Sequence, residues 1–167
     1  GIPVSGHLGL TPQSVSALGG FRLQGKGADA AKRIVEDAKI LEEAGAFCVL
    51  LELVPDRVCK IITERSDNAL IMGLGSGPDA HGQLLIYHDM FGLYPKFTPK
   101  MAKVFGNAGE VILNGLKSYN KEVKDKTFPS DENTFGMKDE DFDKLFKMLS
   151  WGGKMSELQK RLEISSD

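Results

Sequence analysis

The stretch AGAFCVLLELVP, residues Ala44 to Pro55, decides the fold expected for this chain. Between Cys48 and Val54 it is an apolar run interrupted by one carboxylate, Glu52. Continuous runs of this kind are typical of parallel strands that are covered on both faces, so the stretch predicts a strand of a parallel sheet. Glu52 falls near the carboxyl end of that strand, where ligands bind in open α/β sheets and in barrels.

The residues around Glu52 predict a chemical role for it, because leucine flanks it on both sides. A carboxylate held against apolar side chains loses solvation of its charged form, which raises its pKa and makes it a better proton acceptor near neutral pH. The pattern leaves a second interpretation open, in which Glu52 turns outward at the strand end or pairs with a structural cation.

Composition narrows the class of protein. The chain has 167 residues, 41% hydrophobic and 26% charged, as is usual for one globular domain with its own core. Its net charge of -2 provides no basic surface for nucleic acid or an anionic membrane. No apolar run approaches the roughly 20 residues that span a bilayer, and the N-terminus lacks the basic region of a secretory signal. Cys48 and Cys59 are predicted to be buried free thiols, which indicates a reducing intracellular compartment, cytoplasmic or mitochondrial.

Strand, loop and helix alternate along most of the chain, which predicts parallel βαβ units with right-handed crossovers. The predicted strands are Ile2 to Ser5, Cys48 to Val54, Ala69 to Met72 and Gln83 to His88. The predicted helices are Ala28 to Ala44, Asp56 to Arg65 with Val58, Ile61 and Ile62 inward, one resuming at Lys100, one through Val111 and Val123, Asp139 to Ser150, and a last one capped by Ser156. Four strands cannot close a barrel of eight, so this is either an open sheet or half a barrel.

Two glycine-rich stretches are expected near the ligand site predicted at the carboxyl ends of the strands. The turn Gly6 to Gly9 is predicted to place His7 at the carboxyl end of the first strand. Residues Gly19 to Gly27 predict an ordered loop over the mouth of the site. Within this loop, Arg22 and Lys26 either contact an anionic ligand or are simply solvated.

Two other stretches carry weaker signals. GLGSG, Gly73 to Gly77, lacks the Walker lysine and the dinucleotide spacing, so it predicts a tight βα turn rather than a phosphate loop. The helix predicted from Asp139 is amphipathic, and packing on the parent domain or on a neighbouring subunit is favoured over binding to another partner. Its apolar side chains are Phe142, Leu145, Phe146 and Leu149.

Four segments together closely resemble ketopantoate hydroxymethyltransferase, over about Gly1 to Phe135. They are GHLGLTPQS (6–14), GGFRLQGKG (19–27), LEEAGAFCVLLELVP (41–55) and HGQLLIYHDMFGL (81–93). The resemblance implies a (β/α)8 TIM barrel in a large homo-oligomer. It also implies transfer of a one-carbon unit from 5,10-methylenetetrahydrofolate to 3-methyl-2-oxobutanoate, with Mg2+, in pantothenate biosynthesis.

Carried over residue by residue, the resemblance puts Glu52 on the proton acceptor and His7 on a substrate-binding histidine. A histidine that merely ties down its loop remains the alternative for His7. The match begins at the family's fifth strand, so residues 1–137 are expected to be the C-terminal half-barrel, strands 5 to 8, and 138–167 a helical C-terminal extension. No metal ligands are expected in this chain, because the metal-binding carboxylates belong to the missing N-terminal half, which must be supplied elsewhere. His81 replaces the family's aspartate before Gly-Gln, and a surface histidine without a partner is expected there.

Two alternatives remain at this point. One is a related enolate-forming barrel of the phosphoenolpyruvate mutase and isocitrate lyase group, although the nucleophilic cysteine motif of the lyases is missing. The other is a non-catalytic half-barrel that acts as an interaction module, because the chain matches only half of the family and adds an amphipathic tail.

Overall fold

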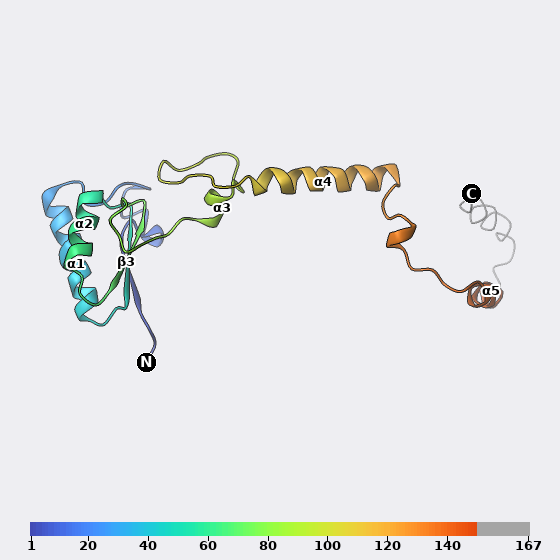
Figure 1. Ribbon diagram of the computed structural model, residues 1–167, viewed down its shortest axis with the longest axis horizontal. Helices are drawn as coiled ribbons and strands as arrows, with labels where there is room; N and C mark the ends of the chain where they lie inside the picture. The colour runs from blue at the N-terminus through green and yellow to red at the C-terminus, as the bar shows by residue number, and fades with distance from the viewer. Residues whose placement is uncertain (150–167) are drawn as a thin grey trace. The chain divides into compact units, whose positions relative to one another are not determined.

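The computed structural model describes residues 1–149, and Figure 1 shows its elements. In chain order they are β1 (Ser5–Gly9), η1 (Pro12–Ser14), α1 (Ala28–Glu43), β2 (Cys48–Glu52), α2 (Asp56–Arg65), β3 (Leu70–Leu74), β4 (Gly82–Gln83), α3 (Tyr87–Met90), α4 (Ala108–Asp125), η2 (Asp131–Asn133) and α5 (Asp139–Met148). No helix among these residues is long and apolar enough to cross a bilayer.

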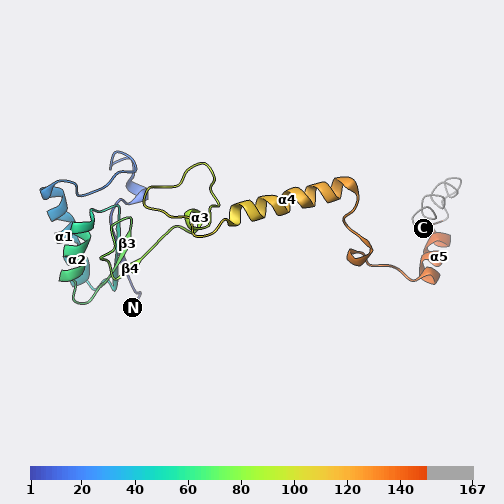
Figure 2. The ribbon, with the colours of Figure 1, turned by 45° about the horizontal axis from the view of Figure 1, so that its top comes forward.

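A parallel sheet organises the first part of the chain. Its four strands are hydrogen-bonded in the order β1-β2-β3-β4, and every pair is parallel. Helices α1 and α2 cover the same face of this sheet, as both views of the ribbon show (Figures 1 and 2). The predicted α/β class is therefore confirmed, and the arrangement is consistent with part of a (β/α)8 barrel.

The hydrophobic core lies between this sheet and the two helices. Alternate side chains of a strand point to opposite faces, so Val49 and Leu51 face the helices while Leu50 and Glu52 face the other way. Burial of each such valine or leucine side chain stabilises the folded state by about 1.5–3 kcal/mol relative to leaving it exposed. The buried members of the core are Ala38, Val49, Leu51, Val54, Cys59, Ile62, Ala69 and Ile71.

Both helices of this face agree with the sequence. Helix α1 ends at Glu43, one residue before the predicted Ala44, with Gly45 at φ +92° just beyond it, and α2 has the predicted bounds. Cys59 is buried as predicted, and this burial raises the pKa of its thiol. Cys48 is only half-buried, because it lies on the face opposite the helices, and Ile61 is exposed, so these two burial predictions are wrong.

Strand β1 begins later than predicted. It runs from Ser5 to Gly9 and pairs in register with β2, so His7 lies inside the strand and not in a turn beyond it. The glycines misled the sequence interpretation, because they serve close packing. A Cβ on Gly6 would come within 2.6 Å of Leu41 Cδ1 on α1, so a larger residue would require the Leu41 side chain to move.

The segment after β3 also differs from the prediction. GLGSG leads into β4 and not into a helix, and β4 has only two residues instead of Gln83 to His88. Within the described chain β4 pairs with β3 alone, and after Leu84 N donates to Gly73 O the backbone leaves the sheet. The helix predicted from Lys100 is absent, because Phe105 N bonds to Met90 O in an irregular loop.

Helices α4 and α5 confirm the helices predicted through Val111 and Val123 and from Asp139. The chain divides into two compact units, Gly1–Gly115 and the part from Leu116 onward. The domain boundary predicted after residue 137 stays a prediction. The helix predicted after Ser156 lies outside the described residues.

Candidate functional site

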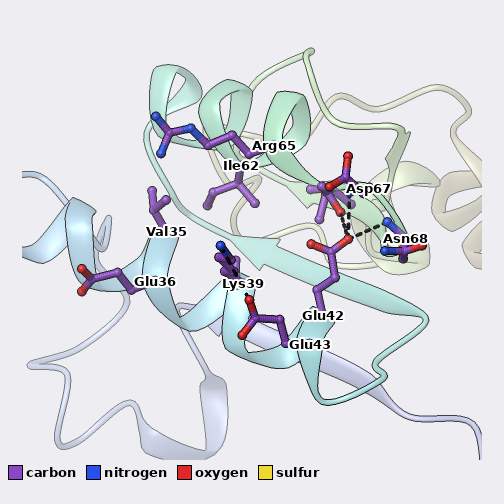
Figure 3. A pocket seen from close by; sticks show the side chains of 12 residues that line it. Val35, Glu36, Lys39, Glu42, Glu43, Ile62, Arg65, Asp67 and Asn68 are labelled. Carbon is purple, nitrogen blue, oxygen red and sulfur yellow. Dashed lines mark hydrogen bonds and ion pairs between the residues drawn. The ribbon is translucent and has the colours of Figure 1, made fainter.

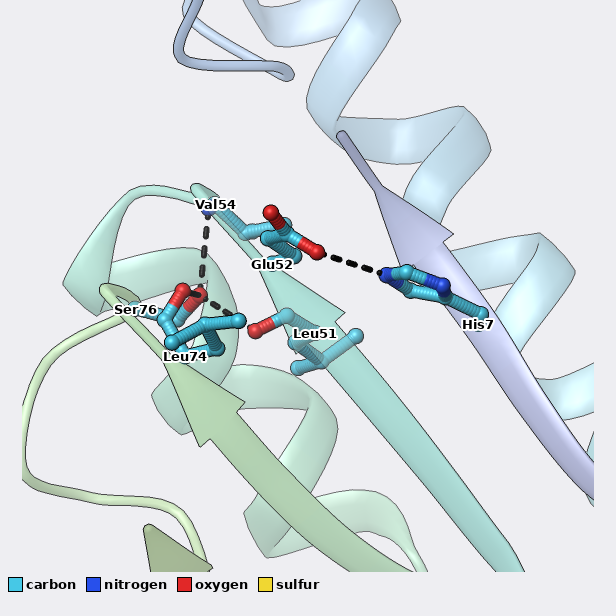
Figure 4. A network of polar contacts seen from close by, with 6 residues as sticks. All are labelled: His7, Leu51, Glu52, Val54, Leu74 and Ser76. Carbon is cyan, nitrogen blue, oxygen red and sulfur yellow. Dashed lines mark hydrogen bonds and ion pairs between the residues drawn. The ribbon is translucent and has the colours of Figure 1, made fainter. Parts of the chain in front are cut away.

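The structure brings the two predicted site residues into contact. The register pairs Gly9 with Glu52 and His7 with Leu50, so His7 reaches Glu52 diagonally on the sheet face opposite the helices. His7 Nε2 lies 3.1 Å from Glu52 Oε2 (Figure 4). The Glu52 side chain is only 10% exposed and that of His7 29%, so the contact is partly shielded from water.

The absence of a side chain at Gly9 leaves room for this diagonal contact between His7 and Glu52. Gly9 has φ +85°, and a Cβ at this position would collide with the carbonyl oxygen of Glu52. Next to it, Leu10 N donates to that same carbonyl at 2.8 Å. The first strand therefore ends tightly against the backbone of Glu52, with no side chain between His7 and the carboxylate on this side.

The contact with His7 gives the two carboxylate oxygens of Glu52 different surroundings. An ionised carboxylate can only accept hydrogen bonds, so against ionised Glu52 the Nε2 of His7 is the donor. Oε2 is then engaged, and Oε1 has no hydrogen-bond partner among the described residues. The arrangement can hold a carboxylate in one orientation and offer its second oxygen to a proton.

Immediately after Glu52 the backbone takes an unusual course. Leu53 has φ +48°, in the left-handed region that non-glycine residues rarely adopt. The hydroxyl of the buried Ser76 donates to Leu51 O at 2.7 Å and accepts from Val54 N at 3.1 Å, so it bridges the backbone around Glu52. Sequence reasoning missed Ser76, and the only signal was its position inside the GLGSG stretch.

A cavity of about 270 Å³ opens beside His7. Residues of α1, among them Arg33 and Asp37, line it, so it lies on the helix side of β1, and Glu52 is not one of its lining residues. Arg22 and Lys26 do not line this cavity and are exposed, so their contact with an anionic ligand stays a prediction.

A larger cavity of about 670 Å³ lies at the opposite, amino end of the strands, between α1 and α2 (Figure 3). Here Glu42 Oε1 accepts hydrogen bonds from Ser66 Oγ and from the backbone of the next three residues, Asp67, Asn68 and Ala69. These bonds, that from Asn68 N above all, lower the pKa of Glu42. The role of Glu42 is to fasten the turn before β3 to α1.

The described residues do not form a metal site by themselves. No group of three or more histidine, cysteine, aspartate or glutamate side chains in residues 1–149 is placed to hold an ion. His81 is exposed, as predicted, but its Nδ1 accepts a hydrogen bond from Ile71 N at 3.0 Å. The expectation that His81 has no partner is wrong, because it supplies an acceptor where β4 begins beside β3.

Comparison with known proteins adds independent evidence. A family model described as ketopantoate hydroxymethyltransferase matches residues 1–131. Three similar proteins are each named 3-methyl-2-oxobutanoate hydroxymethyltransferase: one from Clostridium kluyveri, 53% identical over 146 residues, one from Clostridium botulinum strain 657, 49% over 145, and one from Syntrophobacter fumaroxidans, 50% over 137.

These alignments cover most of this chain but only part of each relative. They include 87%, 87% and 82% of the chain, and 52%, 52% and 48% of the three relatives in the same order. The chain thus spans about half the length of the curated relatives it matches. The family match favours this family over the phosphoenolpyruvate mutase and isocitrate lyase group. The chain belongs to the ketopantoate hydroxymethyltransferase family.

Proposed function

We propose that the chain provides the C-terminal half, strands 5 to 8, of a (β/α)8 barrel that transfers a hydroxymethyl group to 3-methyl-2-oxobutanoate. Four parallel strands in sequence order, with α1 and α2 on one face, support this proposal, because successive barrel units have that arrangement. Family membership over half the length of the relatives supports it further. The N-terminal half would come from a second polypeptide or from a longer form of this one.

Glu52 is the general base in this proposal. Its Oε1 takes the proton from C3 of the oxo acid, the C3–H electron pair becomes the C2=C3 bond of an enolate, and charge moves to the C2 oxygen. C3 then forms a bond to the methylene carbon of 5,10-methylenetetrahydrofolate. Both C–N bonds of that methylene carbon break, and one water supplies the hydroxyl group of the product 2-dehydropantoate. The two nitrogens of the tetrahydrofolate that leaves receive the remaining proton of the water and the proton taken from C3.

His7 supports this step in two ways. Its Nε2–H holds Glu52 Oε2, so the other oxygen is directed consistently towards the substrate. The histidine also lies beside the carboxylate on the sheet face opposite the helices, where it is proposed to contribute to substrate binding. Holding the carboxylate through one oxygen is expected to add to the rate because the base is oriented before the substrate arrives.

The metal and the compartment belong to the proposal as well. Mg2+ would stabilise charge on the enolate oxygen when bound. Its ligands are assigned to the N-terminal half on the family resemblance, and no step of this chain's residues runs through it. A homo-oligomer in a reducing compartment is proposed on the family resemblance, and the bacterial relatives give the mitochondrial alternative no support.

The observation that carries the proposal is the 3.1 Å contact of the nearly buried Glu52 with His7 at the carboxyl end of the strands. The test is to mix the chain with the N-terminal half of a relative and to measure folate-dependent formation of 2-dehydropantoate. Product is expected from the mixture and not from either half alone. A mixture that assembles by mass but forms no product would instead favour the non-catalytic interaction module.

A further inference from the structure

We propose that Ser76 is a positioning residue for Glu52, whose hydroxyl group fixes the backbone on both sides of the general base. This inference rests on the proposed function, because it concerns the same carboxylate. It gives a role to the GLGSG stretch, which the reaction described above does not use.

The hydroxyl group of Ser76 is placed to do this. It is buried, with 1% of the residue exposed, and it donates to Leu51 O at 2.7 Å while accepting from Val54 N at 3.1 Å (Figure 4). One side chain thus joins the residue before Glu52 to the second residue after it. Because Val54 is buried, loss of the hydroxyl group would leave Val54 N without this acceptor inside the fold.

The backbone between these two bonds needs such support. Leu53 directly follows Glu52 and has φ +48°, a conformation that costs a residue with a Cβ free energy and persists only where its surroundings enforce it. Two backbone bonds contribute, from Leu53 N to Leu74 O and from Gln24 N to Leu53 O. Ser76 adds a third hydrogen bond, in which its hydroxyl group accepts from the backbone N–H of Val54, the residue after Leu53.

Two glycines direct the serine into this position. Gly75 and Gly77 have φ +65° and +87°, and they turn the loop so that Ser76 points back into the sheet. A Cβ on Gly75 would lie 2.5 Å from Met101 Sδ, and one on Gly77 2.6 Å from Asp56 Cβ. The glycines of GLGSG are therefore required by close packing and backbone conformation around a buried hydroxyl group, and not by a bound phosphate.

Loss of the hydroxyl group is expected to act on the chemical step. If residues 51–54 relax, the Glu52 carboxylate moves relative to both His7 and the substrate. A misplacement of about 1 Å can lower a rate by up to roughly 10²-fold. Substrate binding, which involves other groups of the pocket, is expected to change little.

The test uses the assembled protein with both halves and compares Ser76→Ala with Ser66→Ala. Ser66 is a matched control, because its hydroxyl group also lies within hydrogen-bond distance of two partners, Glu42 Oε1 and Ala69 O, but at the other end of the sheet. Ser76→Ala is expected to lower kcat roughly ten- to hundredfold with KM nearly unchanged. Ser66→Ala is expected to lower the Tm and to leave kcat unchanged.

Amide hydrogen exchange at Val54 reports the bridge without any turnover. Its amide should be protected in the unsubstituted protein and exchange faster in Ser76→Ala. If Ser76→Ala does not fold, Ser76→Cys takes its place, since a thiol is a weaker donor and acceptor, and the kcat loss should be smaller but still confined to kcat.

The outcomes separate the two proposals. An active protein in which Ser76→Ala or Ser76→Cys retains full kcat overturns the positioning role alone, as does an equal kcat loss in Ser66→Ala. If the unsubstituted assembly forms no product with any N-terminal half, the proposed function itself fails, and the positioning role fails with it.

Discussion

Strand β1 can end against the backbone of Glu52 only because Gly9 has no Cβ atom. Gly9→Ala should destabilise the protein, because it introduces a Cβ at φ +85° that collides with the carbonyl oxygen of Glu52. Gly45→Ala is the matched control, with φ +92° but nothing within 4 Å of a Cβ. The free energy of unfolding from urea titration should fall by about 1–3 kcal/mol more for Gly9→Ala than for Gly45→Ala. Equal losses would mean that only the conformation matters and not the contact.

At this scale the sequence indicated Glu52 and His7 but not the groups that position them. Glu52 could be identified from the sequence because a carboxylate in an apolar run is unusual, and its place at a strand end could be inferred from the pattern. The left-handed conformation of Leu53 has no sequence signal, since leucine is rarely found there. Ser76 remained hidden for the same reason, because its partners are backbone atoms that only the fold brings together.

Among the elements, helix α1 is joined to the turn before β3 through Glu42 (Figure 3). Hydrogen bonds from that turn lower the pKa of Glu42 below its ordinary value of 4.5. A carboxylate with a depressed pKa in the folded state stabilises the fold above its unfolded pKa and loses this contribution as the pH falls through the folded value. The stability of the unsubstituted protein should therefore exceed that of Glu42→Gln near neutral pH, and the difference should narrow on acidification.

Urea midpoints measured from neutral to acid pH would check this prediction. Glu43→Gln is the control, because Glu43 is the exposed neighbour of Glu42 and its ion pair among residues 1–149 is with Lys39, at 3.6 Å. Its effect should be small, as for most exposed ion pairs. A difference for Glu42→Gln that stays constant below pH 4.5 would show that the charge on Glu42 is not what fastens the turn.

The elements themselves were predictable where the chain alone determines them. Helix α2 has an apolar face of its own and clear ends, and its bounds agree with the sequence. Strand β4 was overestimated, because an apolar run becomes a long strand only where neighbouring strands accept its backbone, and the described chain offers β3 alone. The residues from Lys100 have a helical pattern but are held in a loop by backbone bonds to Met90 and Phe91.

For the whole molecule, the proposed barrel makes the sheet face opposite the helices an interior. Cys48 lies on that face and is half-buried in the chain alone. Iodoacetamide should therefore modify Cys48 in the isolated chain and react much more slowly after an N-terminal half has been added, because barrel interiors are filled by side chains. Mass spectrometry of the modified peptides measures both rates.

Cys59 is the internal control for that experiment. Burial in the core raises the pKa of its thiol and leaves little reactive thiolate, so it should remain unmodified until the protein unfolds. If Cys48 reacts equally fast in the isolated chain and in an assembly of the correct mass, the two halves do not close around this face, and the barrel proposal is contradicted.

The most direct measurement follows the C3 hydrogen of 3-methyl-2-oxobutanoate by proton NMR in D2O, with the assembled protein and no folate. This isolates the proton transfer assigned to Glu52 from the later steps. Exchange of the C3 hydrogen for deuterium is expected with the unsubstituted protein, slower by about 10²- to 10⁴-fold with Glu52→Gln and unchanged with the control Glu43→Gln. Equal exchange rates for the unsubstituted protein and Glu52→Gln would contradict the role of Glu52 as the general base.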